Sequence, residues 1–571
     1  MAVLVLVGVY FAWSLWSTRA ALMDARVTGA QLRLALSHQD PVASRRSLSA
    51  LQREFHTAHS DSSGPVWALA SVLPLVGDDI EAVRLVARSG DQLAEGAVSV
   101  IVNRADGGLS TKLAPRGGRI DLRALKSVTP LVTRTSHDFN QASSELDTIR
   151  SSGLTRWVRP AFVAYRSTVD HVAGTLATAD KAVQVLPAML GKSGPRAYLV
   201  MFDTNAEIRA TGGLPGAFSI VRTVGGKINQ IAQGSDADFP VFDNPVLPET
   251  DAESQLYGDQ MGIYLHDTNF TPEFPRTAAL VRRMWERVHH QRVDGVVSID
   301  AVSVAYLLRA TGPIQVRGIT LTARNAVGEL LNKVYVRLPD PGQQDEFFKS
   351  VASAVFHHLT SGVRSPTELV AALAQSAREG RLYVHDFEPA VQRHLTASGV
   401  SGDLTGGDPR VPRTGFYLND ATGSKMSYFL RHRVRLTPLA CADGTQELQG
   451  TAALTYTKDS PPIKDLPPYI SGGGKYGTPV GQQLVLARIY GPVGGELSHL
   501  RVAGEEIPVD PVMDRGRPVT TAVVELRRGQ TVRVDWRVVT GPHQDRPAQL
   551  TVTPGLEAVP AVTEVASKCG S

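Results

Sequence analysis

Residues 196–232 read RAYLVMFDTNAEIRATGGLPGAFSIVRTVGGKINQIA, and this stretch decides how the middle of the chain folds. Its first seven residues form a short, mostly apolar run that predicts a β-strand. Residues 216–232 contain two further strand-like segments separated by Gly225 and Gly226, which is a strong hairpin signal. The sequence therefore predicts that a β-sheet begins near residue 196.

The segments that follow add helices to this sheet. Residues 293–300, VDGVVSID, predict a buried strand. Residues 301–313, AVSVAYLLRATGP, predict a helix that ends at Gly312 and Pro313. Because strands and helices alternate, we expect a layered α/β or α+β domain over residues 191–425.

The segments on either side of this domain have other periodicities. Apolar residues at spacings of three and four predict long helices through residues 18–190, and we expect a helical bundle or stalk there. Residues 531–539 alternate between apolar and polar side chains, as a strand with one buried face does. Several such short strands predict an immunoglobulin-like β-sandwich over residues 426–571. The expected fold class is therefore multidomain.

The N-terminus reads MAVLVLVGVYFAWSLWS, and the first charged side chain is Arg19. A helix of that length spans about 25 Å, close to the ~30 Å of a hydrocarbon core. Trp13 and Trp16 lie where an interfacial aromatic belt is expected. A secretory signal peptide is the alternative, but the basic n-region is missing. We therefore expect a transmembrane anchor over residues 1–17, with a true start upstream, in a single-pass membrane protein whose bulk lies outside the cell.

Composition limits the partners and the chemistry. The chain has 571 residues, 43% of them hydrophobic, and a net charge of +4 without a dense basic stripe, so we expect no nucleic-acid partner. The cysteines, Cys441 and Cys569, allow one disulfide in an oxidising compartment, or two free thiols. The sequence has no CxxC motif and no Cys/His cluster that would indicate a metal site.

The loop after the first strand holds the candidate binding residues. Arg209 offers a planar fork for phosphate oxygens, and glycine backbone can approach an anion closely. Glu207 or Asp267 has the chemistry to hold Mg²⁺, so this cation is a possible cofactor. The alternative is a surface ion pair beside a tight turn. The candidate ligand-binding residues are Asn205, Glu207, Arg209, Gly212, Gly213, Asp267 and Asn269. No catalytic residue is assigned.

Four separated segments carry a family resemblance. They are residues 197–228, 264–287, 293–316 and 415–430, which begin AYLVMFDTN, YLHDTNF, VDGVVSID and GFYLNDATGSK. In this order they closely resemble a bacterial, largely actinobacterial, family known only as a domain of unknown function (number 4012). The resemblance implies no activity.

The order of elements also resembles the LytR-CpsA-Psr phosphotransferase domain. Its members are membrane-anchored enzymes that move glycopolymer from a polyprenyl-pyrophosphate carrier to the cell wall. Residues 277–316 are similar to its later block, and Asp203, Glu207 and Arg209 lie near its first acidic and arginine motif. The second arginine motif is missing, since only Arg222 lies nearby.

Two functions follow as hypotheses. The first is a cell-envelope protein that binds or transfers polyprenyl-phosphate-linked glycan or another cell-wall polymer. The second is a non-catalytic envelope scaffold or interaction protein.

Overall fold

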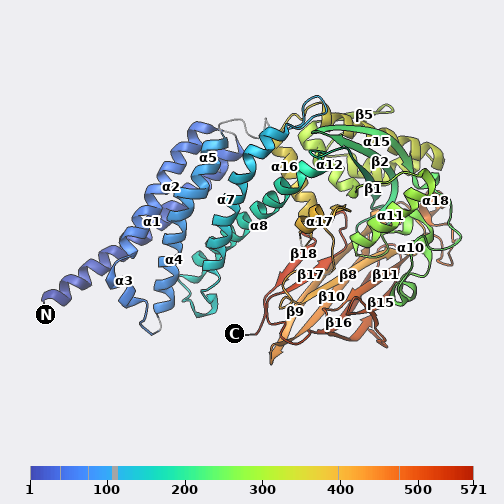
Figure 1. The fold of residues 1–571 in the computed structure, drawn as a ribbon. Helices are drawn as coiled ribbons and strands as arrows, with labels where there is room; N and C mark the ends of the chain where they lie inside the picture. The colour runs from blue at the N-terminus through green and yellow to red at the C-terminus, as the bar shows by residue number, and fades with distance from the viewer. Residues whose placement is uncertain are drawn as a thin grey trace. The chain divides into compact units, whose positions relative to one another are not determined.

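The computed structural model describes residues 2–38, 40–74, 76–105, 114–396, 398–404, 406–474 and 476–569, and it divides the chain into two compact units. Unit 1 comprises residues 1–114 and 121–187, and unit 2 comprises residues 115–120 and 188–571. Helices make up unit 1, whereas unit 2 contains all the β-sheets (Figure 1).

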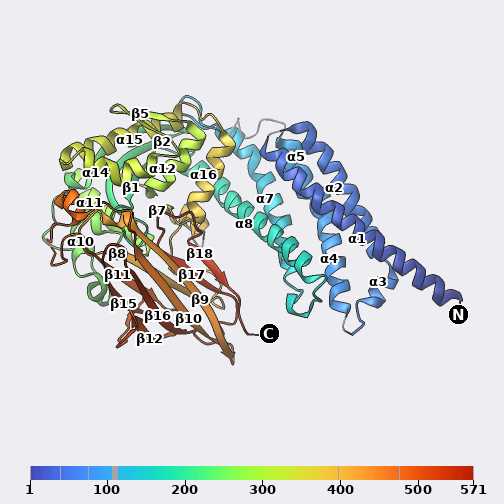
Figure 2. The same ribbon diagram turned by 180° about the vertical axis from the view of Figure 1, so that it is seen from behind.

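Unit 1 is a bundle of long helices, as Figures 1 and 2 both show. Capping residues mark several helix starts: Asp40, for example, accepts a hydrogen bond from the Ala43 N–H, and Pro41 occupies the first turn. The helices are α1 (Ala2–Ser37), α2 (Pro41–Ser62), α3 (Pro65–Ala70), α4 (Gly77–Leu93), a π-helical turn (Ala94–Val98), α5 (Ser99–Ala105), α7 (Leu122–Leu146) and α8 (Arg159–Met189).

The prediction of a transmembrane anchor over residues 1–17 is wrong. Helix α1 continues without a break from Ala2 to Ser37, and its continuation carries Arg19, Asp24 and Arg26. A spanning helix needs about 20 consecutive, mostly apolar residues. No helix in the described part of the chain is long and apolar enough to cross a membrane. The predicted single-pass location in the cell membrane is overturned by the same finding.

A five-stranded sheet in the order β3-β2-β1-β4-β7 forms the first half of unit 2. Strands β1 and β4 are parallel, and the other neighbours are antiparallel. Gly225 and Gly226, both with positive φ, form the predicted turn between β2 and β3. The strands are β1 (Arg196–Thr204), β2 (Leu214–Val224), β3 (Lys227–Ser235), β4 (Gly295–Asp300) and β7 (Leu382–Asp386).

Helices cover both faces of this sheet. Leu199 and Met201 of β1 belong to the core that includes α11, whereas Val200 and Phe202 contact the core that includes α12 and α15. This alternation follows from the two-residue period of a strand. The helices of this half are α9 (Asp251–Tyr257), α10 (Gln260–Ile263), α11 (Phe274–His289), α12 (Ala301–Thr311), α13 (Ala326–Gly328), α14 (Val334–Arg337), α15 (Pro341–Ser361), α16 (Pro366–Arg378) and α17 (Pro389–Leu395), with a short hairpin of β5 (Ile314–Val316) and β6 (Ile319–Leu321).

A β-sandwich forms the second half of unit 2. One sheet has the order β13-β12-β16-β10-β9 and the other β14-β15-β11-β8-β17-β18. Trp536 of β16 stacks on Phe416 of β8 with ring centroids 5.3 Å apart, inside the core between the sheets. The strands are β8 (Arg413–Asp420), β9 (Leu430–Ala442), β10 (Thr445–Tyr456), β11 (Gln483–Tyr490), β12 (Glu496–Val502), β13 (Glu505–Ile507), β14 (Val512–Asp514), β15 (Arg517–Leu526), β16 (Thr531–Val539), β17 (Ala548–Val552) and β18 (Val562–Val565), and a short helix, α18 (Pro468–Ser471), lies between β10 and β11.

Two features of the sandwich concern the predicted boundaries and the cysteines. Strand β8 belongs to a sandwich sheet, so the sandwich begins at Arg413 and not near residue 426. Cys441 and Cys569 form a disulfide with Cα atoms 5.2 Å apart, which ties the end of the chain to β9. The α/β half and the sandwich form one compact unit, so a single core joins them.

Candidate functional site

The loop between β1 and β2, residues 205–213, is buried along its whole length. Its backbone closes on itself, because the Gly212 N–H donates to the Arg209 carbonyl oxygen at 2.8 Å and the Leu214 N–H donates to Glu207 at 3.0 Å. Gly212 has a φ of +128°, and a Cβ on Gly213 would lie 2.3 Å from the Thr204 carbonyl carbon. Both glycines therefore serve the turn.

Arg209 lies at the centre of a buried ion network. Its Nη2 atom is 2.8 Å from Glu207 Oε1 and 3.0 Å from Asp267 Oδ1. Glu207 Oε2 in turn accepts from Lys425 Nζ at 2.6 Å. The guanidinium also lies over the Phe270 ring, 4.7 Å from its centroid. Arg209 is only 4% exposed. Glu207 and Arg209 therefore do pair, as the alternative interpretation of the sequence expected, but the pair is buried and belongs to a network of four charged side chains.

The network continues toward solvent through His266. Its Nε2 atom is 3.8 Å from Asp267 Oδ2, and its Nδ1 atom is 3.3 Å from Asp236 Oδ2. Burial lowers the pKa of His266, but the two carboxylates more than offset this and raise it above its usual value. When His266 is protonated, charges alternate from Lys425 to Asp236.

Burial and charge move the pKa values of the carboxyl groups in opposite directions. Burial raises the pKa of Glu207, but Lys425 and Arg209 outweigh it and bring the pKa to about 2. Burial and the Glu207 charge raise the pKa of Asp420 to about 6. Burial likewise raises the pKa of Asp267, against the effect of Arg209. Glu207 is thus the carboxylate most firmly ionised.

Of the two predicted asparagines, Asn205 is the first residue of the loop, and Asn269 lies in the segment that precedes α11. Asn205 Nδ2 donates to Asp300 Oδ2 at 3.0 Å, and Asn269 Nδ2 donates to the Gly213 carbonyl oxygen at 2.6 Å. The Oδ1 atoms of both carboxamides are buried, and neither has a hydrogen-bond partner among the described residues. Asn205 therefore belongs to a neighbouring network around Asp300, whereas Asn269 supports the turn.

Sequence reasoning missed that second network. Arg381 Nη1 donates to Asp300 Oδ2 at 2.8 Å, and Arg381 Nε donates to Glu379 Oε2 at 2.6 Å. Tyr306 adds a hydrogen bond to Glu379 at 2.8 Å. Arg381 lies just before β7 and is 1% exposed. The chain contains many arginines, and nothing in the local sequence distinguishes this one as buried. Only the fold brings it to Asp300.

The residues predicted to hold Mg²⁺ do not form an open carboxylate pair. Glu207 and Asp267 converge, but the Arg209 guanidinium lies between them. Among the residues that the structure describes, no group of three or more His, Cys, Asp or Glu side chains has the geometry to hold a metal ion.

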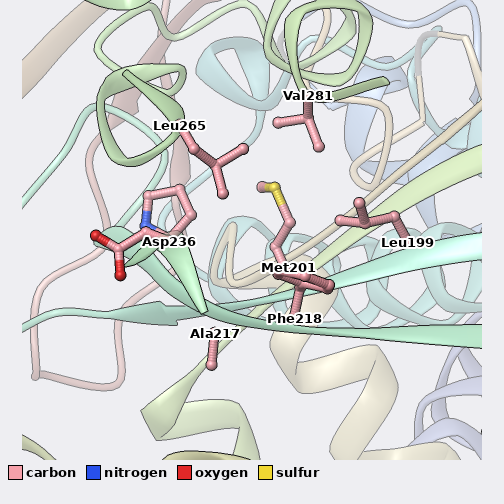
Figure 3. Close-up of a pocket in the computed structure, with 8 residues that line it drawn as sticks. Leu199, Met201, Ala217, Phe218, Asp236, Leu265 and Val281 are labelled. Carbon is pink, nitrogen blue, oxygen red and sulfur yellow. The ribbon is translucent and has the colours of Figure 1, made fainter. Parts of the chain in front are cut away.

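A small apolar cavity lies between the sheet and α11 (Figure 3). Leu199, Met201, Leu265 and Val281 line it, with Asp236 on one side. Its volume is about 10 Å³, which is space for about one water molecule. A ligand larger than that would require the sheet and the helix to separate.

Comparisons with known proteins identify one family whose model matches part of the chain. The model of a family described as "Protein of unknown function (DUF4012)" matches residues 193–335, which confirms the resemblance to that family. The resemblance to the LytR-CpsA-Psr domain stays a prediction. No curated protein matches the chain.

Among solved structures, this chain is similar to one titled as the transcriptional regulator yvhJ from Bacillus subtilis. The match has 12% identity and a TM-score of 0.20, and it covers 38% of this chain and 84% of that one. We draw no conclusion from a likeness at that TM-score.

Proposed function

We propose that the protein is a non-catalytic scaffold or interaction protein, in which residues 205–213 lock the α/β half of unit 2 onto the β-sandwich. The observation that supports this most directly is the closed ion network. Arg209 is 4% exposed and binds two carboxylates of its own chain, 2.8 and 3.0 Å away.

The backbone of the loop supports the same role. The Asp420 N–H donates to the Ile208 carbonyl oxygen at 2.9 Å, and the Ala210 N–H donates to Asn419 Oδ1 at 3.1 Å. The Ser427 N–H donates to the Ala206 carbonyl oxygen at 3.1 Å. Alternate residues of the loop therefore bond to the end of β8 and the segment after it. Such paired backbone groups stabilise a buried loop, because an unpaired one is costly there.

The charge balance disfavours an anionic ligand at this place. Two cations, Arg209 and Lys425, face three carboxyl groups, those of Glu207, Asp267 and Asp420. A phosphate would have to displace Glu207 or Asp267 from Arg209 and leave that carboxylate buried without a partner. Breaking a buried pair in this way costs about 3–5 kcal/mol.

Titration of the full chain with a short-chain polyprenyl pyrophosphate, with and without Mg²⁺, tests the proposal. We expect no saturable binding. Hydrogen exchange should show that residues 205–213 are protected to the same degree as β8, because both open only when the two halves of unit 2 separate. Saturable binding that Arg209→Lys weakens would overturn the scaffold proposal.

One observation favours the alternative, a protein that binds lipid-linked glycan or another cell-wall polymer. The unpartnered Oδ1 atoms of Asn205 and Asn269 are acceptors that sugar hydroxyl groups satisfy. In this alternative the lipid chain would enter the apolar cavity beside Asp236. This alternative requires that the cavity opens on binding, and the same titration decides between the two.

A further inference from the structure

Helix α1 has an inner face that packs within unit 1. Ala25 and Leu32 share a core with Leu48, Leu51 and Phe55 of α2. Thr28 Oγ1 of α1 donates a hydrogen bond to Glu54 Oε1 of α2 at 2.9 Å. Over residues 10–36 of α1, the buried residues are Ser14, Thr18, Ala21, Ala25, Thr28, Leu32 and Ala35. Their spacing alternates between four and three, as expected for one face of a helix against a neighbouring helix.

The opposite face of α1 is also apolar but lies in solvent. This outer seam consists of Trp13, Trp16, Ala20, Met23, Val27 and Ala30, with spacings of three and four in alternation. Trp13, Trp16, Met23 and Val27 are 54%, 70%, 53% and 58% exposed. At 100° per residue the mean direction of this seam lies about 140° from that of the inner face, so α2 does not cover it. Solvent-exposed side chains of this size at heptad spacing are the pattern of a coiled-coil seam without its second helix.

Charged residues flank the outer seam in a definite order. In a heptad whose a and d positions are the seam, Arg19 and Arg26 occupy g, and Asp24 occupies e. All three are exposed, and none forms an ion pair with another described residue of the chain. Their charges are therefore available to a second helix.

We propose that the outer seam of α1 binds the same seam of a second copy of this chain as a parallel coiled coil. In a parallel pair the g position of one helix meets the e position of the next heptad in the other. This register places Arg19 opposite Asp24 of the second copy, and by symmetry Asp24 opposite Arg19. An antiparallel pair would set g against g and bring arginines together. Charge complementarity therefore selects the parallel arrangement.

The helix does not have to form when the second copy binds. The seam from Trp13 to Ala30 is about 26 Å long, and an isolated helix of that length is marginal in water. Here the inner face already holds α1 against α2, so the conformational entropy of the helix is lost on folding of unit 1. Because the seam is short, we expect reversible self-association in the micromolar range.

Sedimentation velocity of the full chain over a series of concentrations tests the proposal. We expect a monomer–dimer equilibrium that Val27→Glu shifts to monomer, with at least a tenfold weaker association. The matched control is Val42→Glu, because Val42 is also a valine, 65% exposed, on α2. The control should leave self-association unchanged.

Charge exchange tests the orientation. Arg19→Asp and Asp24→Arg should each weaken the dimer, and the double variant should restore it. Ala30→Cys should form a disulfide with its own copy in the parallel pair. An antiparallel pair centred on the seam would hold the two positions about 26 Å apart along the helix axes. Both native cysteines are already joined to each other.

Three results would overturn the proposal. One is a monomer at every concentration. Another is self-association that Val27→Glu leaves intact or that Arg19→Asp strengthens. The third is binding of the monomeric chain to lipid vesicles that Val27→Glu abolishes, which would assign the seam to a lipid surface instead.

Discussion

Replacing Arg209 by methionine tests whether the buried ion network holds unit 2 together. Glu207 keeps Lys425, 2.6 Å away, but Asp267 keeps only His266, 3.8 Å away. The change therefore leaves one buried carboxylate without an adequate cation. Removing one partner of a buried pair costs about 3–5 kcal/mol. We expect the free energy of unfolding of unit 2 to fall by an amount in this range at pH 7.

Protonation of Asp267 limits that loss. Burial already raises the pKa of Asp267 against the effect of Arg209, so removal of Arg209 raises this pKa further. The variant should therefore bind a proton at Asp267 when folded and release it on unfolding. A group whose folded pKa is raised contributes stability below its unfolded pKa and loses it as the pH rises. The deficit should therefore shrink as the pH falls, by at most about 1.4 kcal/mol for each pH unit.

Hydrogen exchange followed by mass spectrometry is the appropriate assay, because peptides from β1 and β8 report on unit 2 alone. The control is Arg533→Met, since the Arg533 side chain is 68% exposed and pairs with Asp535 on the surface. We expect little or no change there. Asp267→Asn added to Arg209→Met should recover part of the loss. A loss of stability equal to that of the control, or one that does not depend on pH, would refute the idea that the Arg209 network holds unit 2 together.

The remaining predictions concern the turn, the tail and the histidine. Gly213→Ala should destabilise by about 1–3 kcal/mol or more, because its Cβ would lie 2.3 Å from a backbone carbon. Gly216→Ala is the control, since no atom would lie closer than 3.8 Å, and urea unfolding compares the two. Cys569→Ser opens a loop with a sequence separation of 128 and should cost up to about 4–5 kcal/mol, whereas an equal stability of oxidised and reduced protein would contradict this. The raised pKa of His266 predicts a stabilisation that is complete below about pH 6.5 and is lost as the pH rises through the folded pKa. In His266→Gln this pH dependence should vanish from thermal unfolding curves.

Local sequence patterns by themselves determined the elements of unit 2. The paired glycines at 225 and 226 predict the turn between β2 and β3, which the structure contains at that place. The alternation over residues 531–539 predicts β16, whose four alternate apolar residues are buried. Such patterns are reliable because strand period, helix period and turn chemistry depend on neighbours a few residues away. The family resemblance rests on the same local segments.

The end of the first helix was predicted wrongly from the same kind of pattern. An apolar run up to Ser17 indicates a helix but not where it ends, and α1 continues to Ser37. The apolar run also does not predict that one face of the helix packs on α2 while the other face is exposed to solvent. Packing against another helix determines which face is buried, and the number of apolar residues in a 17-residue run does not reveal that packing.

Only the tertiary structure decided what Glu207 and Arg209 do. Their spacing predicts a pair, which exists, but the partners that close it are Asp267 and Lys425, 58 and 218 positions away from the residues they bind. Whether such charges meet solvent, a ligand or one another depends on which distant segments cover them. Here the α/β half and the sandwich bury the loop between them, so the charges are satisfied within the chain. Whether a charge can be buried depends on the whole fold, because burying a charged side chain costs free energy unless the fold also buries an oppositely charged partner beside it.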